Sequence, residues 1–311
     1  MNQHPARTPF FSPRRVMILA GNTFTQLVRM KIFYFLLIFI VIAIVLNFFR
    51  LPHTVGPESV GAEELRSLKS PLIGVMKLFA VILGIAATAL LIPRDLEDRT
   101  LYTILAKPVP RLDYLLGKFL GVLALILVGL AAMAILLNVV LHFRTQEILA
   151  ERMALADGMI ERGYWTEADR QGERLEVLRH GPTWSLQGAL LAVFLEAAVI
   201  AAAALLISTF SSSTLFTVVI TTLVYFIGHF VADGREFWLR TSSLGEDLTV
   251  HLASRALVVM FPDFRPFGVV DEAIAGQALP PSVLGALALS SFFYVGIYVV
   301  LSWFVFSDKE I

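Results

Sequence analysis

The sequence predicts an all-α polytopic membrane protein, with six membrane-spanning helices in one domain over residues 1–311. Two observations predict this class. The chain is 57% hydrophobic and only 16% charged, whereas ordinary soluble domains carry about 25% charged residues. Its apolar residues also gather in long runs, several near or above the roughly 18 residues typical of a bilayer-spanning helix. These features argue against a soluble enzyme and against a disordered chain.

Six apolar runs are the expected spans, and helices are their natural form because a segment in lipid must satisfy its own backbone hydrogen bonds. The first run, which starts at Ile32, is not a signal peptide, since 31 residues precede it and no small-residue cleavage site follows. Only Phe210, Ser211 and Ser212 separate the fourth run from the fifth, which predicts a tight hairpin. The runs cover residues 32–49, 72–93, 119–142, 185–209, 213–232 and 283–306.

The distribution of Lys and Arg predicts the orientation of the bundle. With the N-terminus in the cytoplasm, the inner segments carry a net charge of +5 and the outer segments −5. The basic residues of the short loops then obey the positive-inside rule, so we expect both termini to be cytoplasmic. The whole chain has a net charge of zero, which gives no electrostatic case for a nucleic-acid partner.

An amphipathic helix is expected over residues 14–31, ahead of the first span. Its apolar side chains recur at helical spacing, and basic residues stand at both of its ends, as in helices that lie in the membrane interface. The alternative is a soluble segment that merely obeys the positive-inside rule. The apolar stripe consists of Val16, Leu19, Ala20, Phe24, Leu27 and Val28.

Residues 94–118, between the second and third spans, are the most informative segment. A short helix is expected to begin just after Pro93, because acidic residues crowd its first turn, where the helix dipole favours negative charge. Pro108 and Pro110 would end it, and a new helix would then enter the third span. An ordinary connector rarely needs about 25 residues, so a docking element with charged and apolar surface is favoured. The candidate docking residues are Glu97, Asp98, Arg99, Leu101, Ile104, Leu105, Pro108 and Arg111.

Two longer segments are expected on the outer side. Residues 143–184 are polar and helical in pattern, and Gly163 is expected to divide them into two helices. This segment is either an external cap or a solvated spacer. In the second segment, an apolar patch at 256–261 is too short to span a bilayer and fits a re-entrant or interfacial helix, or a loop folded over the bundle.

Catalytic and metal-binding patterns are scarce in this sequence. It contains no Gly-x-x-x-x-Gly-Lys phosphate loop, no His-Glu-x-x-His and no Gly-x-Ser-x-Gly. With no Cys, thiolate chemistry and disulfides are excluded. The six His are scattered without metal-ligand spacing, and His229 is expected to be a packed or interfacial side chain. The sequence therefore predicts no metal site and no cofactor.

Glu196, near the middle of the fourth span, is the sharpest candidate for an intramembrane function. A charge at this depth costs several kcal/mol, so the side chain should face protein or water, or stay protonated. Lys77 is the obvious partner, although the expected spans place the two at depths that differ by roughly 9 Å, and Lys77 can extend toward the membrane surface. An ion pair, a structural hydrogen bond and a role in a substrate path all stay open.

The fourth and fifth spans carry small and hydroxyl side chains in helical repeats. Ala197 and Ala201, like Ala198 and Ala202, are small residues four apart that allow another helix to approach closely. Four threonines of the fifth span could line a cavity, but packing is the simpler expectation. They are Thr214, Thr217, Thr221 and Thr222.

The run from Glu97 to Lys118 resembles the coupling segment of type-2 ABC exporter permeases. That family has an acidic residue, a Gly-Thr-Leu-like step, a Leu-Leu pair, and then a Pro-x-Ser/Pro-Arg and Gly-Lys sequence entering the third helix. Arg99 stands here where Gly is common, and Pro110 where Ser is common. The N-terminal helix, the six spans, Phe261-Pro262 and the last helix are also similar, most closely to the branch of the multi-copper-enzyme maturation permease component.

The resemblance implies a permease subunit that works as a dimer, of two identical or two different chains, in a bacterial inner membrane. Two cytoplasmic ATPase subunits would hydrolyse ATP, and residues from Glu97 to Arg111 would contact them. This chain would then be a transport subunit and not an enzyme. A non-transporting scaffold or sensor, and a membrane-embedded enzyme that uses Glu196 and His229, are the alternatives. Without Cys or clusters of Met or His, direct copper handling has little support.

Overall fold

The computed structural model describes residues 11–48, 62–97, 109–211, 213–242 and 261–308. Every regular element among these residues is helical, which confirms the predicted all-α class. The elements are α1 (Pro13–Val28), α2 (Lys31–Phe48), α3 (Ala62–Glu97), α5 (Arg111–Glu161), α6 (Glu167–Arg179), α7 (Trp184–Phe210), α8 (Thr214–Ser242), the 3₁₀ helix η2 (Arg265–Gly268), α10 (Val269–Ile274) and α11 (Pro281–Ser307).

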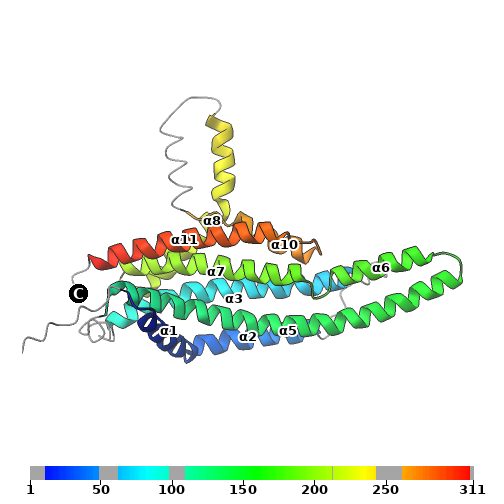
Figure 1. Ribbon diagram of the computed structural model, residues 1–311, viewed down its shortest axis with the longest axis horizontal. Coiled ribbons are helices and arrows are strands. Elements are labelled where there is room, and N and C mark those ends of the chain that lie inside the picture. The colour runs from blue at the N-terminus through cyan, green and yellow to red at the C-terminus, as the bar shows by residue number, and fades with distance from the viewer. Residues whose placement is uncertain (1–10, 49–61, 98–108, 212, 243–260, 309–311) are drawn as a thin grey trace, which may run out of the picture.

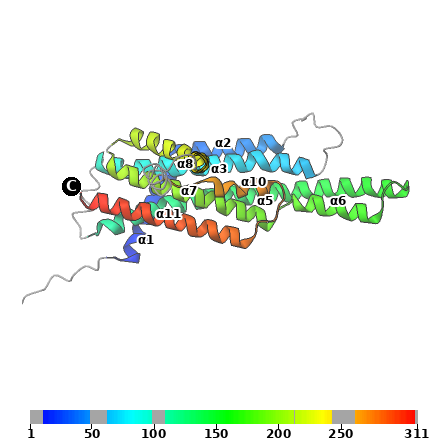
Figure 2. The same ribbon diagram turned by 90° about the horizontal axis from the view of Figure 1, so that it is seen from above.

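The long helices lie side by side along one axis of the molecule (Figures 1 and 2). The middle of this bundle is α7, which packs against α3 on one side and α11 on another. At one end, α1 lies across the bundle and contacts chiefly α5; we call this the α1 end. At the other end, which we call the α6 end, α6 and the second half of α5 form a hairpin that extends beyond the other helices.

Five helical stretches of the described residues are long and apolar enough to cross a membrane. The remaining expected span, at residues 32–49, coincides with the 18-residue helix α2. The protein is therefore an all-α polytopic membrane protein, and its total of six spans stays a prediction. The five stretches are Ala62–Pro93, Arg111–Glu161, Glu167–Phe210, Thr214–Val231 and Pro281–Ser307.

The helix that was expected to begin after Pro93 does not begin there. Instead, α3 continues through Pro93 to Glu97, and it starts at Ala62, ten residues before the expected second span. Proline is tolerated inside membrane helices because neighbouring groups satisfy the backbone carbonyl that it leaves free, and α3 also contains Pro71. The expected restart after Pro110 is confirmed, since Pro110 is the N-cap residue of α5.

The predicted division of the segment 143–184 into two helices is confirmed. The helix α5 runs without a break to Glu161, and Gly163 turns the chain with a φ of +77°, which glycine adopts without steric cost. Thr166 and Asp169 then form a reciprocal capping box at the start of α6. In the second outer segment, the patch at 256–260 lies outside the described residues.

The tight hairpin between α7 and α8 is also confirmed, since α7 ends at Phe210 and α8 begins at Thr214. Beyond the expected fifth span, α8 continues to Ser242, and its second half points away from the bundle (Figure 1). The small residues of α7 allow α3 to approach closely, as their spacing predicts. A Cβ on Gly84 of α3 would lie 3.3 Å from the carbonyl oxygen of Ala197 and 3.7 Å from the Cβ of Ala201.

Candidate functional site

The predicted docking segment joins α3 to α5 at the α1 end. Glu97 is the last residue of α3 and Arg111 the first residue of α5. All six candidate docking residues between these two lie outside the described residues, so their docking role stays a prediction. They are Asp98, Arg99, Leu101, Ile104, Leu105 and Pro108.

Arg111 holds the end of α11. Its Nη1 donates hydrogen bonds to the carbonyl oxygens of Phe306, at 2.7 Å, and Ser307. Both carbonyls belong to the last turn of α11, where intrahelical donors are missing and the helix dipole favours a cation. The guanidinium carbon lies 5.9 Å from the centroid of the Phe306 ring, and this ring stacks on that of Tyr114 with centroids 5.8 Å apart. The start of α5 is thus attached to the end of α11.

Asp113, two residues further along α5, holds the start of α1. Its carboxylate is fully buried and accepts a hydrogen bond from Nε of Arg15 at 2.8 Å. The backbone N–H of Ser12, the N-cap residue of α1, donates to the same carboxylate at 3.3 Å. Asp113 therefore lies at the N-termini of two helices, where both helix dipoles favour an anion.

Two glycines one turn apart let the backbones of α1 and α5 come together. A Cβ on Gly117 would lie 2.4 Å from the Cβ of Leu19. A Cβ on Gly121 would lie 2.6 Å from the Cβ of Thr23 and 2.8 Å from the carbonyl oxygen of Ala20. No larger residue fits at these positions without moving α1. The four residues of α5 that hold α1 and α11 form what we call the α5 junction: Arg111, Asp113, Gly117 and Gly121.

Glu196 joins three helices within the bundle. Its Oε2 lies 3.0 Å from Nζ of Lys77 on α3, and its Oε1 lies 3.7 Å from Nε2 of His229 on α8. The glutamate side chain is fully buried, whereas those of Lys77 and His229 are 28% and 33% exposed. Of the alternatives that the sequence leaves open for Glu196, the structure contains the ion pair with Lys77. It also brings His229 to this carboxylate, whereas the sequence analysis expected a packed or interfacial side chain and joined His229 to Glu196 only in the enzyme alternative.

The orientation of the His229 ring follows from its second contact. Nδ1 lies 3.0 Å from the carbonyl oxygen of Tyr225, one turn earlier on α8. Because a carbonyl can only accept, Nδ1 carries a proton, and Nε2 is the nitrogen that faces Glu196. The Tyr225 ring packs edge-on against that of His229, with centroids 4.6 Å apart. The buried carboxylate of Glu196 thus faces an ammonium from α3 and an imidazole from α8.

An aromatic side chain packs over this cluster. The ring of Phe264 lies 5.4 Å from that of His229 and 5.7 Å from that of Tyr225, measured between centroids. Phe264 is almost fully buried, and its backbone N–H donates to the carbonyl oxygen of Gly228 at 3.1 Å. A Cβ on Gly228 would lie 2.5 Å from the Phe264 ring, so this approach requires glycine.

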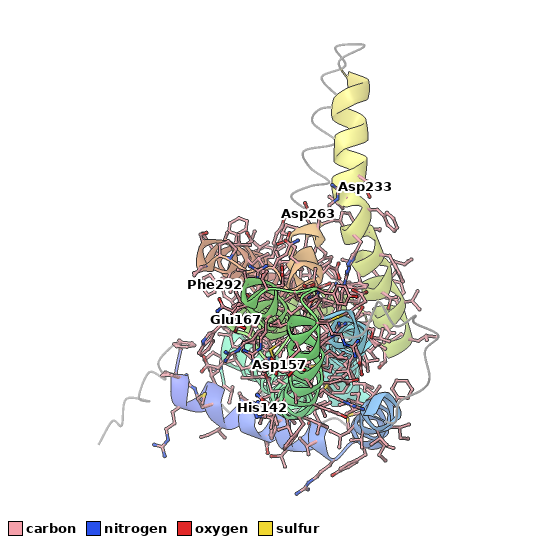
Figure 3. All side chains as sticks on the ribbon, turned by 90° about the vertical axis from the view of Figure 1, so that its right-hand side faces the viewer. His142, Asp157, Glu167, Asp233, Asp263 and Phe292 are labelled. Atoms are coloured by element: carbon pink, nitrogen blue, oxygen red, sulfur yellow. The ribbon has the colours of Figure 1, made fainter. Side chains whose placement is uncertain are left out.

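The segment that carries Phe264 makes a second contact with α8, at the place where α8 leaves the bundle (Figure 1). Arg265 forms an ion pair with Asp233 of α8, and Figure 3 shows Asp233 and Asp263 near each other at this place. Both side chains of the pair are partly exposed, so the contact orients the segment more than it stabilises it.

A buried lysine lies between α3 and the turn before α7. Lys69 is 1% exposed, and its Nζ lies 3.5 Å from Nδ1 of His180. The ring of His180 in turn packs against Gly276, whose φ is +78°. Among the described residues, no acidic side chain pairs with Lys69 within 4.0 Å, and no group of His, Asp or Glu could hold a metal ion.

The threonines of α8 behave as packing residues. Thr217 and Thr221 are fully buried. The Thr221 hydroxyl donates to the carbonyl oxygen of Thr217 at 2.7 Å, and the Thr222 hydroxyl to that of Val218 at 2.8 Å. Hydroxyls that bond within their own helix need no other partner, which agrees with the expectation of packing.

The bundle of long apolar helices defines the class of a polytopic helical membrane protein, and its described residues contain no group that could hold a metal ion. Residues 23–156 match the model of a family described as ABC-2 family transporter protein. This match contains the run from Glu97 to Lys118 and supports an ABC-2 type permease, as the resemblance implied. The match thereby supports a membrane permease component of an ABC transporter. No curated protein matches the chain.

Sequence reasoning found Glu196 with its candidate partner Lys77, and it found Arg111, but it missed the contact of Arg111 with the end of α11. The sequence analysis assigned no role to Asp113. The Gly-x-x-x-Gly spacing of Gly117 and Gly121 that follows it does indicate that another helix packs closely there. Arg15, the partner of Asp113, is 98 residues away in sequence. No spacing rule connects the two.

Proposed function

We propose that this chain is the membrane-spanning permease subunit of an ATP-driven exporter, with the α1 end in the cytoplasm of a bacterial cell. Residues 97–111 would dock on a separate ATPase subunit, and a second permease chain, identical or different, would complete the assembly. The family match over residues 23–156 carries this proposal.

The position of the docking segment supports the proposal. It joins the end of α3 to the start of α5, two long helices that lie side by side over the length of the bundle. A push on this segment therefore acts directly on two apolar helices. The sequence carries no phosphate loop of its own, so the proposed nucleotide chemistry belongs to another chain. The positive-inside rule supports placing this end in the cytoplasm.

The test is a pull-down of the full chain, solubilised in detergent and co-expressed with the reading frames adjacent to its gene. We expect recovery of a protein that contains a phosphate loop and hydrolyses ATP. Leu101→Asp, which places a charge on the apolar docking face, should reduce that recovery by about tenfold or more, because a desolvated carboxylate in an apolar interface costs well over 1.4 kcal/mol. Reversal of the charges at Glu97, Asp98 and Arg99 should act in the same direction.

Glu176→Lys is the matched control for these charge changes. Glu176 is exposed on α6, at the opposite end of the molecule, so its reversal should leave ATPase recovery unchanged. Full recovery with Leu101→Asp and with the reversed charges would contradict docking at this segment.

The cluster around Glu196 keeps the membrane-enzyme alternative testable. That alternative predicts an activity without nucleotide that Glu196→Gln removes while the assembly stays intact. In the permease, we propose that Glu196 holds α3 and α8 against α7, because it contacts Lys77 and His229 at once. Glu196→Gln should then weaken the bundle, and Glu196→Gln with Lys77→Met should recover part of the loss, since no cation is left unpaired.

A further inference from the structure

The geometry points to the α5 junction as a branch point, through which a displacement of the docking segment reaches α1 and α11 as well as α5. Arg15 and Arg111 are then positioning residues, one for each branch. This inference rests on the proposed function, because it needs a partner that moves the docking segment.

The displacement enters at the first turn of α5. The helix begins at Arg111, directly after the docking segment, and its N-cap residue Pro110 makes no side-chain capping bond. The first eleven residues of α5 nevertheless include seven fully or nearly fully buried side chains or glycines, Asp113 and Tyr114 among them. A helix start that is buried in this way cannot move without moving the elements packed on it.

The branch to α1 combines a polar contact with direct backbone packing. Asp113 holds Nε of Arg15 at 2.8 Å and the N–H of Ser12 at 3.3 Å. One and two turns further along α5, Gly117 and Gly121 admit α1 so closely that any side chain there would collide with it. Because α1 is followed at once by α2, this branch leads into the first expected span.

The branch to α11 depends on different atoms. Arg111 donates to the carbonyl oxygens of the last turn of α11, and Tyr114 stacks on Phe306, which is fully buried. Figure 1 shows α11 and α1 on opposite sides of the start of α5. The polar contact of each branch uses a different arginine, Arg15 for α1 and Arg111 for α11, so a substitution can address one contact at a time.

The first arm of the experiment uses the full chain alone in lipid nanodiscs and measures amide hydrogen exchange. Arg15→Ala should raise exchange in the first two turns of α1 by about tenfold, the effect of losing a hydrogen bond to a charged group, and leave the last turn of α11 unchanged. Arg111→Ala should do the reverse. Equal effects of both variants on both helices would overturn the branch point.

The second arm measures movement in the complex with the ATPase subunit. The chain has no Cys, so introduced cysteines carry spin labels without a background. Labels at Met17 on α1 and Phe304 on α11, each paired with one at Leu215 on α8, occupy sites that are 68%, 63% and 74% exposed. A non-hydrolysable ATP analogue should change both distances by about 2 Å or more, the size of helix shifts at interfaces.

The variants then separate the branches. Arg15→Ala should reduce the nucleotide-dependent change in the distance from Met17 and leave the change in the distance from Phe304 intact. Gly121→Ala should reduce the change at Met17 further, because the added methyl group pushes α1 away from α5. Arg111→Ala should reduce only the change at Phe304, with recovery in Arg111→Lys, which keeps a donor. Arg14→Ala, an exposed neighbour on α1, is the control and should change neither distance.

The outcomes distinguish the two proposals. If no ATPase associates, or if nucleotide changes neither distance in the unsubstituted chain, the proposed function fails and this inference fails with it. If nucleotide changes each distance by the same amount in the unsubstituted chain and in the three variants Arg15→Ala, Gly121→Ala and Arg111→Ala, the proposed function stands and the branch point is wrong.

Discussion

The two ends of α5 carry Arg–Asp ion pairs of nearly the same length in opposite surroundings. At the α1 end, Nε of Arg15 lies 2.8 Å from Asp113, whose side chain is fully buried. At the α6 end, Nε of Arg170 lies 2.9 Å from Asp157, whose side chain is 56% exposed. Figure 3 shows Asp157 and Glu167 on the α5–α6 hairpin, which faces the viewer there.

The difference teaches that distance alone does not measure what an ion pair contributes. Water screens the exposed pair, and both of its partners keep their hydration when the contact opens. The buried carboxylate of Asp113 has only protein groups to replace its hydration, so it depends on Arg15 and the N–H of Ser12. One helix is therefore firmly attached at one end and weakly attached at the other.

The largest expected effect comes from breaking the pair at the buried carboxylate. Arg15→Met leaves Asp113 without its cation and should lower the free energy of unfolding by about 1.5–3 kcal/mol, the usual range for a hydrogen bond to a charged group, because the Arg15 side chain is itself 25% exposed. Thermal unfolding in nanodiscs measures it. The double variant Arg15→Met with Asp113→Leu should recover much of the loss.

Asp157→Ala is the matched control on the same helix. It removes the carboxylate of the exposed pair, and its unfolding midpoint should stay within experimental error of the unsubstituted chain. A loss equal to that of Arg15→Met would remove the distinction between the two ends.

A pair of glycine substitutions gives the next largest effect. Gly121→Ala brings a Cβ to 2.8 Å from the carbonyl oxygen of Ala20, and backbone cannot move aside without shifting α1. We expect a loss of about 1–3 kcal/mol. Gly158→Ala, near the other end of α5, meets no atom within 4 Å and should instead stabilise the helix by about 1 kcal/mol. Shifts of opposite sign in the unfolding midpoints of the two variants would support the difference between the two ends of α5, and shifts of the same sign would contradict it.

The smallest effect is expected at the start of α6. Thr166 accepts a hydrogen bond from the N–H of Asp169 and donates its own N–H to the Asp169 carboxylate at 2.8 Å. Thr166→Ala should cost about 1 kcal/mol. The loss should stay local, as faster amide exchange in α6 without a change in α1. Faster exchange in both helices would mean that the hairpin is not independent of the α1 end.

The sequence predicted which segments are helices better than it predicted where they end. Apolar runs located α2, α7 and α11 to within about two residues, because their limits coincide with polar or turn residues. The predicted helix start after Pro93 was wrong because proline ends helices in water, whereas α3 accommodates Pro93 inside the bundle. Gly163 was correctly interpreted because a positive φ leaves few alternatives.

The depth offset between Lys77 and Glu196 shows why contacts were harder to predict. It assumed that the second and fourth spans start at residues 72 and 185, whereas α3 starts at Ala62 and α7 at Trp184. Lys77 and Glu196 then lie at similar distances along their helices from Ala62 and Trp184. The long lysine side chain spans the remaining offset, so that its Nζ lies 3.0 Å from Oε2 of Glu196. Pairs between separate helices, like Asp113 with Arg15, depend on packing that periodicity does not encode.

The helix α5 is continuous for 51 residues, which makes a rod of roughly 76 Å, well over twice the thickness of a bilayer core. A continuous rod of this length carries a tilt at one end to the other end. A tilt of about ten degrees around its midpoint swings each tip through roughly 7 Å. Under the proposed function, a tilt of α5 driven at the α1 end would therefore displace the hairpin tip at Gly163 by the same distance.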